Sequence, residues 1–149
     1  MSGAASTIHD CRVIGLPRIV RPEGGLTPVE QGDLPFDIRR IYYLYDVPGG
    51  AGRGGHAHRQ LEQLVVCVMG CFVVDLDDGA GRKSIRLERA YEGLYVPRMI
   101  WREMREFSSG GICLVLASAP YDESDYVRSY EEFKALRDAS AGAGGGGPE

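Results

Sequence analysis

The chain lacks long apolar runs and a strong charge imbalance, and each absence excludes a class of protein. No stretch approaches the roughly 20 apolar residues of a membrane span, and the first residues lack the apolar run of a secretory signal. The formal net charge is -4, so the surface as a whole does not attract nucleic acid. We therefore expect a cytoplasmic protein with no nucleic-acid or membrane partner, although a local cluster of arginines could still bind a small anion.

Cysteine is also scarce, since the 149 residues contain only four. Cys67 and Cys71 form a close pair, but no second pair completes a zinc site. Both lie in the apolar run LVVCVMGCFVV, where cysteine packs as a small hydrophobic residue. The sequence therefore argues against a structural zinc site.

What the chain does contain is a series of short apolar runs separated by glycine and proline. They predict strands at 26–30, 38–46, 55–59, 63–69, 71–77, 84–87, 93–96 and 112–117. Asp78-Gly79 is typical of a hairpin turn, and Gly70 indicates another reversal. Many short strands without helical periodicity between them favour an all-β fold, either an antiparallel sandwich or a barrel.

The length suits a single domain, which we expect to span residues 1–138. One short helix is predicted near the C-terminus, where Ser129 and Glu132 form a capping-box pattern. Phe133 and Leu136 follow at helical spacing. The Gly-rich tail at 139–149 has too few large apolar side chains to pack, and we predict that it is disordered.

Two histidines, His56 and His58, stand out because they lie two positions apart in the segment RGGHAHRQLEQ. Strand side chains alternate between faces, so both imidazoles share one face if this segment is a strand. Histidine transfers protons near neutral pH and is also the commonest metal ligand. Two imidazoles that converge in a barrel predict a functional site of one of these two kinds.

This segment resembles the first motif of the cupin superfamily, which has two histidines, a glutamate four or five positions on, and a glycine about six later. Here Gln63 takes the place of the glutamate, and Arg102 stands five positions after Pro97, where the second motif has its last histidine. A guanidinium is permanently cationic and has no lone pair to donate, so it would repel a divalent ion. We therefore expect no metal and no other cofactor, and we predict that the histidines act as acid and base.

A more specific resemblance rests on six segments that follow in order along the chain. They are PFDIRRIYYLYDV, RGGHAHRQLEQLVVCVMG, LDDG, GLYVPRMIWREMREFS, LVLAS and YDESDYVRSYEEF. Together they resemble the cupin-type dTDP-sugar 3,4-ketoisomerases, which act on dTDP-4-keto-6-deoxyglucose, over about 26–133. Members of that family carry histidine or arginine in the middle of the triplet Trp101-Arg102-Glu103. The resemblance implies a metal-free isomerase with a cupin jelly-roll β-barrel, a homodimeric state and a dTDP-linked keto-deoxysugar substrate.

Moving the ketone from carbon 4 to carbon 3 needs a proton to leave carbon 3 and another to reach carbon 4 through an enediol. A neutral imidazole can take and return such protons at physiological pH. We assign His56 to the carbon atoms and His58 to the proton that passes between the oxygens. The sequence does not decide between this assignment and its reverse.

Substrate binding is expected to involve arginine, whose paired donors suit phosphate oxygens. Arg53 and Arg102 flank the expected pocket and are the candidates for pyrophosphate. Arg40 and Tyr42 share a strand face, and either could stabilise an oxyanion, although the sequence does not tell which face points inward. The remaining carboxylates are interpreted as structural, capping or solvated groups, namely Glu103, Asp77, Asp78, Asp122, Glu123 and Asp125.

Two other functions remain open. One is a dTDP-sugar 3,5-epimerase, which usually pairs a single base with an acidic partner and lacks the paired histidines. The other is a non-catalytic sugar-nucleotide-binding cupin, because a fold alone does not fix function. A metal-dependent oxygenase ranks last, since Arg102 carries the wrong charge for a metal site.

Overall fold

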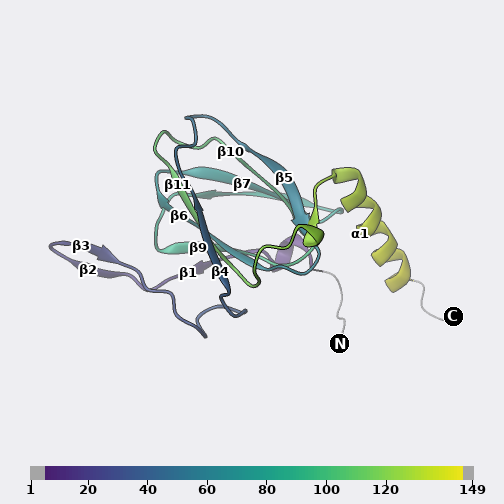
Figure 1. The fold of residues 1–149 in the computed structure, drawn as a ribbon, viewed down its shortest axis with the longest axis horizontal. Coiled ribbons are helices and arrows are strands. Elements are labelled where there is room, and N and C mark those ends of the chain that lie inside the picture. Colours follow the sequence, from purple (N-terminus) through teal and green to yellow (C-terminus); the bar gives the residue numbers. More distant parts are fainter. Residues whose placement is uncertain (1–5, 146–149) are drawn as a thin grey trace.

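The computed structural model describes residues 6–145, and most of its strands form two five-stranded antiparallel sheets that pack face to face (Figure 1). The first sheet has the order β1 (Arg12–Gly15), β9 (Glu92–Val96), β6 (Gln63–Met69), β11 (Ile112–Ala117), β4 (Arg40–Leu44). The second has the order β12 (Tyr126–Val127), β5 (Arg53–His58), β10 (Trp101–Arg105), β7 (Phe72–Asp77), β8 (Arg82–Leu87). This is the all-β jelly roll that was predicted.

Three other elements and a hairpin complete the described chain. The hairpin consists of β2 (Ile19–Arg21) and β3 (Gly24–Leu26), and it projects away from both sheets (Figure 1). The helical elements are η1 (Ile8–Asp10), η2 (Glu123–Asp125) and α1 (Tyr130–Gly145). None of the helices in this part of the chain is long and apolar enough to cross a membrane.

The main core lies between the two sheets, because alternate residues of each strand point inward. In β7 the inward side chains are Phe72, Val74 and Leu76, each at most 1% exposed. They pack with Cys67 and Cys113 from the facing sheet, which confirms that Cys67 packs as an apolar residue. Burying this apolar surface is the main force that holds the two sheets together.

A second apolar cluster covers the outer face of the first sheet. Leu34 and Phe36, from the irregular segment between β3 and β4, pack on Leu64, Val66 and Leu116. The segment at 26–30 was predicted as a strand, but only Leu26 lies in one, at the end of β3. The rest of this segment is a loop, and its Val29 packs against the same cluster without extending the ladder of hydrogen bonds.

The C-terminal helix begins where the capping pattern predicted, since the backbone N–H of Glu132 donates to the Ser129 hydroxyl at 3.2 Å. Phe133 is fully buried and packs on Trp101 and Ala57, so α1 lies against β5 (Figure 1). The helix continues to Gly145, whereas disorder was predicted from Ala139 onward. Alanine favours helix strongly enough to extend an existing helix, and residues 146–149 lie outside the described part of the chain.

Most strands lie close to their predicted positions, but β1, β2 and β12 were missed and, with the greatest consequence, so was β10. Its residues, WREMR, include three charged side chains, so they form no apolar run. The strand is nevertheless central to its sheet, between β5 and β7. This matters for the site, because β10 carries Arg102.

Candidate active site

The two histidines lie on one face of β5, as the two-residue spacing predicted. Their ring centres are 4.9 Å apart and the rings meet edge to face. Ala57, between them, points the other way and packs beneath α1. The ring of Tyr126, on the neighbouring strand β12, lies 5.3 Å from that of His56 and 4.4 Å from that of His58.

Arg102 lies beside this pair, because β10 places it directly opposite His56 in the ladder with β5. Its guanidinium is 3% exposed and donates to the Ile100 carbonyl oxygen from Nε at 3.1 Å and from Nη2 at 2.9 Å. Nη1 donates to Gln63 Oε1, and Gln63 Nε2 donates to the Tyr42 hydroxyl at 3.0 Å. Burial lowers the pKa of Arg102 to about 10, so it stays a fixed cation near neutral pH.

Both histidines are neutral at physiological pH. Burial, and then the Arg102 guanidinium, lower the pKa of His56 to about 3 and that of His58 to about 2. Each imidazole therefore has a free lone pair, although so low a pKa also makes it a weaker base than a histidine that titrates near neutral pH. The same cation disfavours a divalent metal here, and the described residues contain no cluster of three or more histidine, cysteine or acidic side chains that could hold one.

The pocket next to His56 contains every residue that the sequence analysis proposed for substrate binding. It has a volume of about 780 Å³, and its walls include Arg40, Tyr42, Arg53, Arg102 and Arg128. The open question about β4 is thereby answered, since Arg40 and Tyr42 point inward while Ile41 and Tyr43 are more than half exposed. Burial raises the pKa of Tyr42, so its phenol keeps its proton.

A second pocket of about 460 Å³ adjoins the first and is lined by His58. Arg40 and Tyr126 line both pockets, so they form the boundary between them. The two histidines therefore line neighbouring pockets that share Arg40 and Tyr126. This division could not be read from the sequence.

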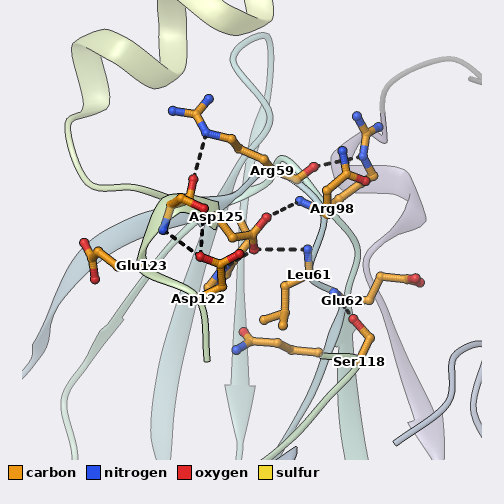
Figure 2. Close-up of polar contacts among 12 residues, drawn as sticks. Arg59, Leu61, Glu62, Arg98, Ser118, Asp122, Glu123 and Asp125 are labelled. Carbon is orange, nitrogen blue, oxygen red and sulfur yellow. Dashed lines mark hydrogen bonds and ion pairs between the residues drawn. The ribbon is translucent and has the colours of Figure 1, made fainter. Parts of the chain in front are cut away.

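Asp125 was interpreted as a solvated or capping residue, and that interpretation is wrong. Its Oδ2 lies 3.1 Å from Nδ1 of His58, and its side chain is only 14% exposed. The backbone N–H of Leu61 also donates to this carboxylate, at 3.3 Å (Figure 2), and that of Gln60 donates to it at 2.7 Å. No local pattern signalled this contact, because 67 positions separate His58 and Asp125.

Arg128 and Tyr126 were also missed. The Arg128 guanidinium lies 4.0 Å from the centre of the Tyr126 ring and donates twice to the Glu123 carboxylate, at 2.8 Å and 2.9 Å. The cation is thus held at the wall of the pocket lined by His56. Both residues belong to the segment YDESDYVR, which contributes to the family resemblance, but the sequence analysis assigned no site role to that segment.

Two other candidates lie outside the site. Arg98 donates to the Arg59 carbonyl oxygen at 3.0 Å and holds the chain after β5. Trp101 packs with Ala57 and Phe133 beneath α1 and donates to Glu103 at 2.8 Å. Glu103 itself lines the pocket next to His56, so its place is at the edge of the site.

Fold and site together define a jelly-roll protein with a pair of histidines beside an arginine-lined pocket, and comparison with known proteins identifies its family. The family described as FdtA: WxcM-like, C-terminal, matches residues 9–138. A curated relative is the TDP-4-oxo-6-deoxy-alpha-D-glucose-3,4-oxoisomerase of Aneurinibacillus thermoaerophilus. It is 44% identical over 124 residues, which cover 83% of this chain and 89% of the relative.

Solved structures agree with this relationship. The sugar 3,4-ketoisomerase QdtA from Thermoanaerobacterium thermosaccharolyticum, solved in complex with TDP, is 37% identical with a TM-score of 0.86, over 89% of this chain and 97% of that one. The WlaRB TDP-quinovose 3,4-ketoisomerase from Campylobacter jejuni is 39% identical with a TM-score of 0.81, over 85% and 98%. The chain belongs to the FdtA, WxcM-like family. The predicted family and the predicted enzyme class, a ketoisomerase, are confirmed.

Proposed function

We propose that this enzyme converts dTDP-4-keto-6-deoxyglucose into a dTDP-3-keto-6-deoxyhexose through an enediol, without a metal. The substrate is supported by the name of the curated relative and by a solved histidine-to-asparagine variant of QdtA in complex with TDP-4-keto-6-deoxyglucose. The observation that carries the mechanism is the pair of contacting, neutral imidazoles beside the buried Arg102 cation. These groups supply bases and a positive charge, which is what enolisation needs.

In the proposed reaction, His56 removes the proton from carbon 3, and the electrons of that bond form the carbon–carbon double bond while the carbonyl oxygen on carbon 4 becomes an oxyanion. His58 takes the proton from the oxygen on carbon 3 and passes it to the oxygen on carbon 4. His56 then returns a proton to carbon 4, which leaves the ketone on carbon 3. The numbers of protons and electrons are unchanged, so no redox cofactor is required.

Arg102 is better suited to the oxyanion than to pyrophosphate. Its guanidinium is almost fully buried and three of its donors already bind protein oxygens. It therefore acts as a fixed positive charge near the reacting atoms, with the Tyr42 phenol as a second donor. Arg53, Arg40 and Arg128 line the same pocket and are proposed to bind the pyrophosphate.

The experiment is incubation with dTDP-4-keto-6-deoxyglucose in deuterated solvent, followed by NMR of the product. We expect a 3-keto sugar with deuterium at carbon 4, and we expect both exchange and turnover to vanish in His56→Asn. Full exchange in His56→Asn would overturn its assignment to carbon. Exchange at carbon 5 would instead support the 3,5-epimerase, and tight dTDP binding without turnover would support a binding protein.

We further propose that the protein is a homodimer that uses the β2–β3 hairpin. This hairpin stands away from the sheets, and Ile19, Val20 and Leu26 on it are 41%, 59% and 59% exposed (Figure 1). Apolar side chains on a projecting element are typical of a surface that is covered by a partner. Light scattering after gel filtration should give twice the chain mass for the wild type and the monomer mass for Val20→Asp with Leu26→Asp, and a monomeric wild type would refute the proposal.

A further inference from the structure

The short turn η2 presents a carboxylate to the back of His58. Asp125 ends this turn, which Asp122 begins by accepting from the Ser124 backbone N–H at 3.0 Å. The Asp125 carbonyl oxygen accepts from the Arg59 backbone N–H at 2.9 Å, so main chain and side chain are both attached to the segment that follows β5. Figure 2 shows Asp125 facing Leu61, with Asp122 and Glu123 beside it. The carboxylate therefore has a fixed orientation toward the ring.

This contact determines where the proton of His58 resides. A carboxylate can only accept hydrogen bonds, so the ring nitrogen that faces Asp125, Nδ1, must be the one that carries the proton. The neutral ring has a single N–H, and the lone pair is consequently on Nε2. Nε2 is buried and has no hydrogen-bond partner among the described residues. An unsatisfied buried acceptor is unusual, and it indicates an atom reserved for a ligand.

We propose that Asp125 is the positioning residue of His58, which holds the ring in the Nδ1–H tautomer so that Nε2 accepts the hydroxyl proton of the substrate. The proposal rests on the ketoisomerase function proposed above. When Nε2 accepts that proton, the ring becomes an imidazolium and the adjacent carboxylate stabilises it. The proton then leaves from Nε2 to the second oxygen, and Asp125 stays ionised throughout.

The variant Asp125→Asn tests this because the surrounding donors determine how the new amide is oriented. The Gln60 backbone N–H, 2.7 Å from Oδ1, would retain the amide oxygen, since it is the closer donor; the Leu61 N–H lies 3.3 Å from Oδ2. The amide NH₂ group would then face Nδ1 of His58 and donate to it, which moves the ring proton to Nε2. We expect ¹⁵N NMR of the free enzyme to detect the Nδ1–H tautomer in the wild type and the Nε2–H tautomer in Asp125→Asn.

Kinetics provide a second readout that a merely structural role would not produce. We expect turnover of the ketosugar to fall by at least about 100-fold in Asp125→Asn, with KM changed by less than about threefold. Exchange of the carbon 3 proton, which we assign to His56, should fall far less, so the ratio of exchange to turnover rises. Asp125→Glu keeps the charge and should recover part of the turnover.

Glu132→Gln is the matched control. Glu132 also binds the segment after β5, since it accepts from Arg59 Nη2 at 2.9 Å, but it is half exposed and does not contact His58. This variant should keep the wild-type tautomer and turnover. An Nε2–H tautomer in the wild type, or equal losses of exchange and turnover in Asp125→Asn, would overturn the proposal. If the tautomer changes as expected but the wild type does not convert the ketosugar, the positioning of His58 stands and the proposed function fails.

Discussion

Acidification should destabilise this protein well above the pH at which its carboxylates protonate, because the site holds a buried histidine, His58, and a partly buried one, His56, both neutral. Burial and Arg102 lower the pKa of His56 to about 3 and of His58 to about 2 in the folded state. The unfolded chain has histidines with a pKa of about 6.5. Below pH 6.5 the histidines are therefore protonated in the unfolded state but not in the folded state. The free energy of unfolding consequently falls as the pH falls.

The size of the effect follows from the same difference. Each histidine lowers the free energy of unfolding by about 1.4 kcal/mol per pH unit once the pH is well below 6.5, which amounts to about 2 kcal/mol at pH 5 relative to pH 8. The two together contribute at most about 4 kcal/mol, because the Asp125 carboxylate, 3.1 Å from His58 Nδ1, favours the charged ring and offsets part of the His58 share. The contribution of the two neutral histidines to the free energy of unfolding is fully present above about pH 7. It is lost progressively as the pH falls from there toward 3.

The assay is urea unfolding between pH 8 and pH 5 at a fixed protein concentration, since association would otherwise change the result. The double variant His56→Asn with His58→Asn should lose at most about 4 kcal/mol of the wild-type pH dependence over this range. His9→Asn is the matched control, because His9 is an exposed histidine on η1, and it should keep the wild-type dependence. A double variant that loses as much stability as the wild type on acidification would refute the reasoning.

Three other changes test particular contacts. Arg102→Met should raise the pKa of both site histidines, which NMR titration detects, and should lower turnover by at least about 100-fold because the oxyanion loses its cation. Gly55→Ala should lower the free energy of unfolding by about 1–3 kcal/mol, since its Cβ would lie 2.5 Å from the Trp101 ring, whereas Gly54→Ala meets nothing within 4 Å and should change stability far less. Ser129→Ala should cost about 1 kcal/mol in thermal or urea unfolding, because α1 loses its N-terminal cap.

The family comparison and the geometry answer different questions. The relatives establish the fold and the kind of enzyme. The contacts in this chain support the separate roles that we propose for His56, His58 and Arg102. One consequence concerns the epimerase alternative, which was set apart because its single base has an acidic partner. His58 also has such a partner in Asp125. What distinguishes a 3,4-ketoisomerase from a 3,5-epimerase here is therefore the pair of imidazoles and the similarity to known ketoisomerases. The position of deuterium in the product tests the choice directly.

Recognition of the strands depended on their apolar content. Strands β6 and β11 lie where they were predicted, at 63–69 and 112–117, because both consist almost entirely of apolar residues and are central to their sheet. Strand β10 was not predicted, since a charged side chain, Arg102, points inward and an apolar one, Trp101, points outward beneath α1, which breaks the usual alternation. Tertiary pairing with β5 and β7 makes it a strand despite this composition.

The sequence alone determined that two imidazoles share one face of a barrel, because alternation along a strand is a local property of the backbone. It also placed a permanent cation, Arg102, at the position where the cupin motif that the segment resembles has its last histidine. Only the tertiary structure decided that Arg102 is buried beside His56, that Asp125 contacts His58 from the turn before β12, and that Tyr126 lines two neighbouring pockets. These contacts join residues far apart in the chain, so they depend on which strands pair and in what register, and no spacing within one segment encodes that.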